Sequence, residues 1–258
     1  MVGFVATMLL ALAAGLLGLL QPNSLSELPP LTAGTMRVFV VRHGQSVHNL
    51  QPPPDLPPSE LDRLTPLGHL QARAAGQALR AQGIGLIVCS PAWRARETAE
   101  AIRAVLGDVE VRVDERLRPL EMGKNGGGAA LEWNDRWAEW EFGRDPTPKD
   151  GESLGQLGMR VFQVILALKD AYADRSVVFV SHSEVISNLT GFLEGTTLTG
   201  RFAARIKNGS LTAVDSPPAA FPRLLLLNFV PAMAEPAPAP AVHDARAARP
   251  PPHRRTAP

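Results

Sequence analysis

The sequence is poor in cysteine: its 258 residues include only Cys89. A single cysteine excludes an internal disulfide and any zinc site built on paired cysteines. Cys89 ends the apolar run 86–89, which predicts a small buried residue rather than a reactive thiol. A His-Glu-x-x-His motif is also absent, so we expect no metal and no cofactor.

The sequence also lacks an excess of charge of either sign. It has 26 lysines and arginines against 25 aspartates and glutamates. This balance gives no reason to expect a nucleic-acid partner or binding to an acidic membrane surface.

Basic residues are missing from the first 36 positions, although residues 1–20 are apolar and almost long enough to span a bilayer. A secretory signal normally begins with a basic region. Three interpretations therefore stay open: a membrane anchor, an atypical signal peptide, or an upstream extension of a protein that starts at Met36. The first two predict an anchored or exported protein, and the third predicts a cytoplasmic one.

Composition divides the rest of the chain. Residues 21–35 read as a polar, proline-containing linker, 36–230 as one folded domain, and 231–258 as a disordered tail rich in proline and alanine. In the domain, apolar runs predict strands over 38–41, 86–89, 109–113, 177–180, 208–214 and 224–229. Helical spacing predicts helices over 65–79, 93–106, 133–140, 151–168 and 184–193. Thr65 is the expected N-cap of the first of these helices, and Pro66 is its expected first helical residue. This alternation is typical of an α/β fold with a mainly parallel sheet.

Three predicted strands are followed by unusual polar residues. The first ends at Arg42 and His43, the second leads into Arg94, and the third ends at His182. If these strands are parallel neighbours, their ends meet at one edge of the sheet, where ligands bind in open α/β folds. The two arginines and two histidines are all potentially cationic, so they repel one another unless an anion binds between them. A phosphoryl group is a suitable anion, because its oxygens match the fork geometry of arginine.

A pocket of this kind suits phosphoryl transfer through a covalent intermediate. A neutral imidazole attacks phosphorus, and neighbouring guanidinium groups lower its pKa so that it stays unprotonated. The arginines supply the positive charge, so the reaction needs no metal.

Five blocks, in order, resemble those of the histidine phosphatase superfamily, which is also called phosphoglycerate mutase-like. They are Arg-His-Gly-Gln-Ser at 42–46 with Asn49, Leu-Thr-Pro-Leu-Gly at 64–68 followed by Gln-Ala at 71–72, Ser-Pro-Ala-Trp-Arg-Ala-Arg-Glu-Thr-Ala at 90–99, Gly-Glu-Ser at 151–153, and Ser-His at 181–182 followed by Val-Ile at 185–186. In the last block Ser183 stands where glycine is usual. The resemblance implies a three-layer α/β/α sandwich. It also implies that His43 is the nucleophile and that Arg42, Arg94 and His182 bind the phosphoryl group.

Other residues of these blocks are candidates for substrate binding. Asn49 and the backbone near Ser183 would add hydrogen bonds, and Gln45 and Ser46 match the signature loop. The proton donor departs from the family pattern, because Pro119 stands at its usual position. Glu121 is the candidate donor, with an exposed loop carboxylate as the alternative reading; Glu184 is a weaker substitute.

These features favour a metal-independent phosphatase that acts on a small phosphorylated metabolite or a phosphoprotein. The alternatives are a phosphoglycerate mutase-type transferase and a non-catalytic phosphate-binding protein. Trp133, Trp137 and Trp140 share one helix face, for which packing is favoured over a role as the roof of a pocket. The oligomeric state stays open.

Overall fold

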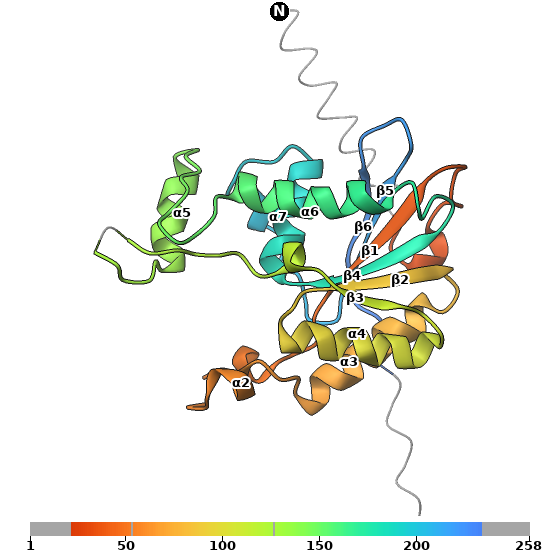
Figure 1. Ribbon diagram of the computed structural model, residues 1–258, viewed down its shortest axis with the longest axis horizontal. Coiled ribbons are helices and arrows are strands. Elements are labelled where there is room, and N and C mark those ends of the chain that lie inside the picture. Colours follow the sequence, from red (N-terminus) through yellow and green to blue (C-terminus); the bar gives the residue numbers. More distant parts are fainter. Residues whose placement is uncertain (1–21, 53, 126, 234–258) are drawn as a thin grey trace, which may run out of the picture.

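A computed structural model describes residues 22–52, 54–125 and 127–233 (Figure 1). The apolar segment 1–20 and residues 234–258 of the predicted tail lie outside the described residues. Within the described ranges, no helix has both the length and the apolar character needed to cross a bilayer.

A six-stranded sheet forms the centre of the fold, in the order β3-β2-β4-β1-β5-β6. The strands are β1 (Met36–Arg42), β2 (Ile84–Cys89), β3 (Val111–Val113), β4 (Ser176–Ser181), β5 (Leu211–Ser216) and β6 (Arg223–Phe229). The first four are parallel, whereas β5 pairs antiparallel with both β1 and β6. The predicted α/β fold with a mainly parallel sheet is thereby confirmed.

Helices cover both faces of this sheet (Figure 1). One face carries α3 (Pro66–Leu79) and α4 (Trp93–Leu106), and the other carries α6 (Leu154–Leu168) and α7 (Ser183–Leu193). The short helix α2 (Pro58–Leu61) precedes α3, and α5 (Trp133–Glu141) lies beyond the end of the sheet. Four 3-10 turns complete the described elements: η1 (Leu25–Glu27), η2 (Val47–Asn49), η3 (Glu115–Leu117) and η4 (Gly200–Phe202).

Two apolar cores fill the spaces between these layers. Val38 and Val40 of β1 face the core beneath α6 and α7, whereas Phe39 and Val41 face the core beneath α3 and α4. A strand buried on both faces needs an unbroken apolar run, which is what β1 has. β1 is therefore held rigidly where it delivers its last residue to the carboxyl edge of the sheet.

Most predicted boundaries agree with the structure. Helix α3 begins as expected, with Pro66 in its first turn and Thr65 Oγ1 accepting a hydrogen bond from Gly68 N at 3.1 Å. Two strands are displaced: β3 covers only 111–113, and β5 begins at Leu211 rather than at 208. In the second case Asn208 and Gly209 form a turn instead, since Gly209 has φ +70° and Ser210 N bonds Lys207 O.

The segment read as a linker contacts the domain over its described part, 22–35. Leu25 is buried in the core beneath α3 and α4, and Pro29 O accepts a hydrogen bond of 2.9 Å from Arg37 Nη2. Arg37 also forms a buried ion pair with Asp215, in which Nε and Oδ1 are 2.7 Å apart. This pair joins β1 to β5 at the edge opposite the candidate site.

Candidate active site

The backbone brings the three polar strand ends together. Arg42 of β1 pairs in register with Ser181 of β4, and Cys89 of β2 pairs with Val180. His43 N then bonds Ser181 O at 3.0 Å, and Ser90 N bonds Val180 O at 2.9 Å. The ends of β1, β2 and β4 are therefore adjacent, as the parallel arrangement predicts.

Arg94, in the first turn of α4, lies between the two histidines. Its Nε donates to His43 Nε2 at 3.1 Å, and its Nη2 donates to His182 Nδ1 at 3.0 Å. The two imidazole rings have their centroids 5.2 Å apart. One guanidinium group therefore binds both rings.

These contacts define the protonation of both rings, because an arginine only donates and a carbonyl only accepts. His43 Nδ1 lies 2.8 Å from Gly44 O, so Nδ1 carries the proton and Nε2 presents its lone pair to Arg94. His182 accepts at Nδ1 and donates from Nε2 to Ser90 Oγ at 2.8 Å. Both imidazoles are neutral in this arrangement.

Burial and charge favour the same neutral state. Burial, followed by the charge of Arg94, lowers the pKa of His43 to about 3. Burial and the neighbouring charges of His43 and Arg94 also hold the pKa of His182 well below its ordinary value. His43 therefore carries an unprotonated nitrogen at neutral pH.

Three supporting residues were not singled out from the sequence. Asp62 pairs with Arg94 Nη1 and accepts a 2.8 Å hydrogen bond from Trp93 N. Ser90 orients His182, and Thr98 Oγ1 accepts from Gly44 N at 3.0 Å. Asp62 follows the proline-rich loop and has no motif around it, so no local signal could have identified it.

Arg42 faces the site from the end of β1. Its Nη1 donates to Ile206 O at 2.5 Å, while its Nε is buried and, among the described residues, has no hydrogen-bond partner. Burial lowers the pKa of Arg42, and the nearby Glu184 carboxylate opposes that effect. A buried donor without a partner is costly, so an anion bound here would satisfy it.

The signature loop uses its own polar groups to hold its shape. Asn49 Oδ1 accepts from Ser46 N at 3.0 Å and from Asn208 Nδ2 at 3.2 Å. Gln45 Oε1 accepts from Thr65 Oγ1 at 2.8 Å, and Asn208 Nδ2 also reaches His43 O at 3.0 Å. Ser46 Oγ also donates to Asn49 Oδ1 at 3.1 Å, so the side chains of Asn49, Gln45 and Ser46 all make contacts within the protein itself.

Two glycines allow this loop to rest directly on α3. A Cβ on Gly44 would lie 2.3 Å from Gly68 O, and one on Gly68 would lie 2.1 Å from Gln45 O. The φ of Gly44 is not in the positive region. Gly44 is needed for close backbone approach instead.

A cavity of about 400 Å³ opens beside Arg42. Trp133 and Trp137 of α5 line it together with Phe202, and Ser183 and Glu184 line it at the start of α7. Trp140 is only 1% exposed and packs in the core. The tryptophan face of α5 thus serves both predicted roles, packing at one end and enclosing a cavity at the other.

The two carboxylates considered as proton donors lie in different surroundings. Glu121 is half exposed, at 49% of its side-chain surface, and accepts a 2.8 Å hydrogen bond from Arg118 Nε. That hydrogen bond lowers the pKa of Glu121, the opposite of what a proton donor requires. Glu121 does not line the cavity, whereas Glu184 does.

The segment 116–121 is held against the sheet by a buried ion pair between Glu152 and Arg160. Arg160 Nη2 lies 2.6 Å from Glu152 Oε1 and also donates to Pro119 O at 3.0 Å. Glu152 Oε1 in turn accepts from Glu121 N at 3.2 Å. The Gly-Glu-Ser block of the sequence therefore supports the loop beside the site.

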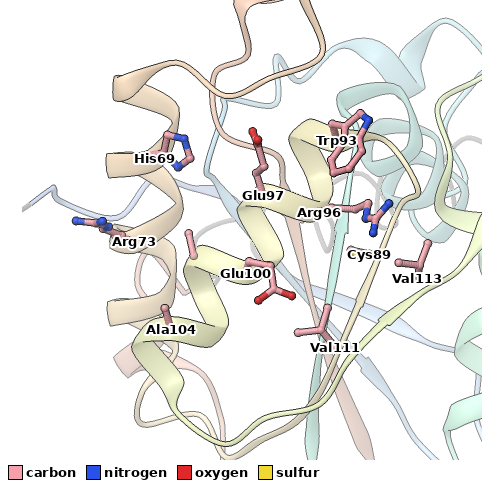
Figure 2. Close-up of a pocket in the computed structure, with 11 residues that line it drawn as sticks. His69, Arg73, Cys89, Trp93, Arg96, Glu97, Glu100, Ala104, Val111 and Val113 are labelled. Atoms are coloured by element: carbon pink, nitrogen blue, oxygen red, sulfur yellow. The ribbon is translucent and has the colours of Figure 1, made fainter. Parts of the chain in front are cut away.

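A second cavity, of about 570 Å³, lies between α3, α4 and β3 (Figure 2). Figure 2 shows His69 and Arg73 projecting from α3, and Glu97 and Glu100 from α4. None of the cluster residues His43, Arg94 and His182 is among those that line this second cavity. We therefore place the candidate site at the carboxyl edge of the sheet, where the strand-end residues gather.

Comparison with known proteins identifies the family. Residues 38–229 match the histidine phosphatase superfamily, branch 1, and the chain belongs to that superfamily. A protein of Yersinia enterocolitica, named as a probable phosphoglycerate mutase GpmB, is 31% identical over 192 residues, which cover 70% of this chain and 85% of the relative.

Solved structures agree with this assignment. A structure described as mycobacterial hydrolase 1 has a TM-score of 0.59 and 28% identity, covering 78% of this chain and 100% of its own. A mycobacterial glucosyl-3-phosphoglycerate phosphatase, solved with VO3, has a TM-score of 0.56 and 27% identity, covering 74% and 98%. The fold and the family are therefore shared with phosphatases and with mutase-like proteins.

Proposed function

We propose that the protein is a metal-independent phosphatase that hydrolyses phosphate monoesters through a phosphohistidine on His43. The observation that carries this proposal is the state of the His43 ring. Its proton is held at Nδ1 by Gly44 O, which leaves Nε2 unprotonated, with its lone pair accepting a hydrogen bond from Arg94 Nε. A buried, neutral imidazole beside a guanidinium is arranged for attack on an anionic phosphoryl group.

The phosphoryl oxygens bind between the arginines and His182. Arg42 Nε has no partner among the described residues, and Arg94 exchanges its bonds to the two rings for charge-assisted bonds to phosphate oxygens. Asp62 stays paired with Arg94 and keeps it in place. These preorganised donors stabilise the charge of the transition state.

The reaction has two steps. His43 Nε2 attacks phosphorus, the ester P–O bond breaks, and the leaving oxygen takes a proton to become an alcohol. Water then attacks the phosphohistidine, its proton is removed by a base, and the P–N bond breaks to release inorganic phosphate. His43 returns to its neutral state.

The substrate class follows from the size of the cavity. A volume of about 400 Å³ falls within the range of small-molecule sites, and its walls combine three aromatic rings with Arg42 and Arg205. These features support a small phosphorylated metabolite rather than a phosphoprotein.

Transfer of the mutase type is the second candidate, because the relative from Yersinia carries that name. Hydrolysis is favoured by the fold around the site. Between Gly123 and β4, the described chain forms only α5, α6 and connecting turns, with no inserted domain to enclose a phosphorylated intermediate.

The deciding experiment measures hydrolysis of an aryl phosphate by the wild type and by His43→Ala, in the presence of a chelator. We expect turnover by the wild type, loss of activity in the variant, and labelled phosphate retained on the wild type after an alkaline quench. His48→Ala, which removes an exposed histidine of the same loop, is the matched control and keeps full activity. Absence of wild-type turnover would leave a non-catalytic phosphate-binding protein, and unchanged turnover in His43→Ala would contradict a phosphohistidine on His43.

A further inference from the structure

We propose that Glu184 is the proton donor to the leaving group, and the base that activates water in the second step. This inference rests on the proposed phosphatase function. Among the described residues, Glu184 is the only carboxylate that lines the cavity beside Arg42. A substrate that occupies this cavity therefore lies beside the Glu184 carboxyl group.

The position of Glu184 in the fold places it in the cavity beside Arg42. It is the second residue of α7 and lies two residues after His182, which binds Arg94. Its negative charge opposes the lowering of the pKa of Arg42, the arginine at the end of β1, by burial. The carboxyl group therefore shares one cavity with a group that grips the phosphoryl oxygens.

Hydrogen bonds hold the carboxyl group in place. Oε2 accepts from Ser183 Oγ at 3.0 Å, and Oε1 accepts from Leu120 N at 3.4 Å. The Leu120 segment is itself fixed to the strand end, because Ser181 Oγ donates to Leu117 O at 2.8 Å. A donor held by such contacts keeps its orientation when the substrate binds.

Glu121 pairs with a neighbouring arginine instead of facing the cavity. It is bound to Arg118, is half exposed, and lies outside the cavity lining. It belongs to a charged surface group with Arg118, while its backbone N–H bonds Glu152. In this proposal the proton donor is therefore Glu184 at the start of α7, and not Glu121 in the loop.

The chemistry balances at each step. As His43 Nε2 bonds to phosphorus and the ester P–O bond breaks, the Glu184 carboxylic acid gives its proton to the leaving oxygen and becomes a carboxylate. In the second step the carboxylate takes a proton from water as the water oxygen bonds to phosphorus. The P–N bond breaks, phosphate leaves, and the Glu184 carboxylic acid is restored.

The test compares Glu184→Gln with Glu121→Gln on two substrates, an aryl phosphate and an alkyl phosphate. The value of kcat/KM reports the first step, in which an aryl leaving group needs no proton and an alkyl one does. For Glu184→Gln we expect kcat/KM to fall about 10²- to 10⁴-fold on the alkyl phosphate and to stay nearly unchanged on the aryl phosphate. For Glu121→Gln we expect neither value to change.

The outcomes separate this inference from the proposed function. Glutamine still accepts the hydrogen bond from Leu120 N, so the variant keeps that contact, and a thermal unfolding curve checks that it folds. Equal effects of Glu184→Gln on both substrates, no effect on either, or a selective effect of Glu121→Gln would overturn the role of Glu184. A wild type that forms no phosphohistidine would instead overturn the proposed function.

Discussion

At the scale of single residues, Arg94 determines the state of the site. It donates to both His43 and His182, so neither ring nitrogen that faces it can carry a proton. Asp62 offsets its charge from outside the cluster. The His43 ring is therefore kept neutral by hydrogen-bond geometry as well as by burial.

This arrangement makes stability depend on pH. The pKa of His43 is about 3 and that of His182 is also well below the ordinary 6.5, so the unfolded chain binds protons that the folded protein does not. The contribution of the two neutral histidines to the free energy of unfolding is fully present above pH 6.5. It decreases as the pH falls from 6.5 toward 3. Within this window His43 contributes about 1.4 kcal/mol per pH unit, and His182 acts in the same direction.

Urea unfolding at pH 7 and pH 5 measures this dependence. The variant His182→Asn is expected to lose less stability than the wild type between these two pH values. His48→Asn is the control, because His48 is exposed, and it should lose as much as the wild type. Identical pH dependence in His182→Asn and the wild type would contradict the interpretation.

At the scale of elements, the signature loop and α3 fit together without space for a side chain. A methyl group on Gly68 would lie 2.1 Å from Gln45 O, which is backbone and cannot rotate away. Gly68→Ala therefore displaces either the start of α3 or the loop that carries His43. We expect the free energy of unfolding to decrease by about 1–3 kcal/mol and kcat to fall strongly.

Gly155→Ala is the matched control, because it places a methyl group in the first turn of another helix, α6. There the nearest atom, Asp145 Oδ2, would be at an ordinary 3.4 Å. This substitution is expected to stabilise the protein by about 0.5–1 kcal/mol and to leave kcat unchanged. Similar effects of the two substitutions on stability and kcat would show that close approach is not the reason for Gly68.

Local patterns account for what the sequence could predict. Buried strands, the Thr65 cap and the polar strand ends are properties of short segments, so the fold and the meeting of Arg42, His43, Arg94 and His182 follow from them. The contact between Arg94 and Asp62, or between His43 O and Asn208, joins segments far apart in the chain. Such contacts depend on the geometry of loops, and loops leave no periodic pattern in the sequence from which that geometry could be predicted.

The two candidate proton donors show the same limit. Glu121 lies in the expected loop, but its side-chain direction is set by Arg118, a neighbour whose effect the sequence does not reveal. Glu184 enters the cavity only because α7 begins directly after β4. Which of two nearby carboxylates faces a site is decided by the path of the backbone between them.

At the scale of the whole molecule, the site lies at one end of the sheet and a buried ion pair at the other. Arg37 and Asp215 join β1 to β5, with side chains 4% and 1% exposed. Arg37 also bonds Pro29 O, so the segment before β1 is fixed by the same group. Removing one partner leaves an uncompensated charge in the interior, which is strongly destabilising.

We therefore expect Asp215→Ala to lower the free energy of unfolding by about 3–5 kcal/mol, measured by urea titration at pH 7. Arg223→Ala is the control: Arg223 lies 3.6 Å from the other oxygen of Asp215 but is 58% exposed. Its loss should cost less than about 1 kcal/mol, because water screens an exposed pair. Below the unfolding transition kcat should be unchanged in both variants, since neither residue contacts the carboxyl edge. A fall in kcat for Asp215→Ala under conditions in which the variant is fully folded would show that the two ends of the sheet are coupled.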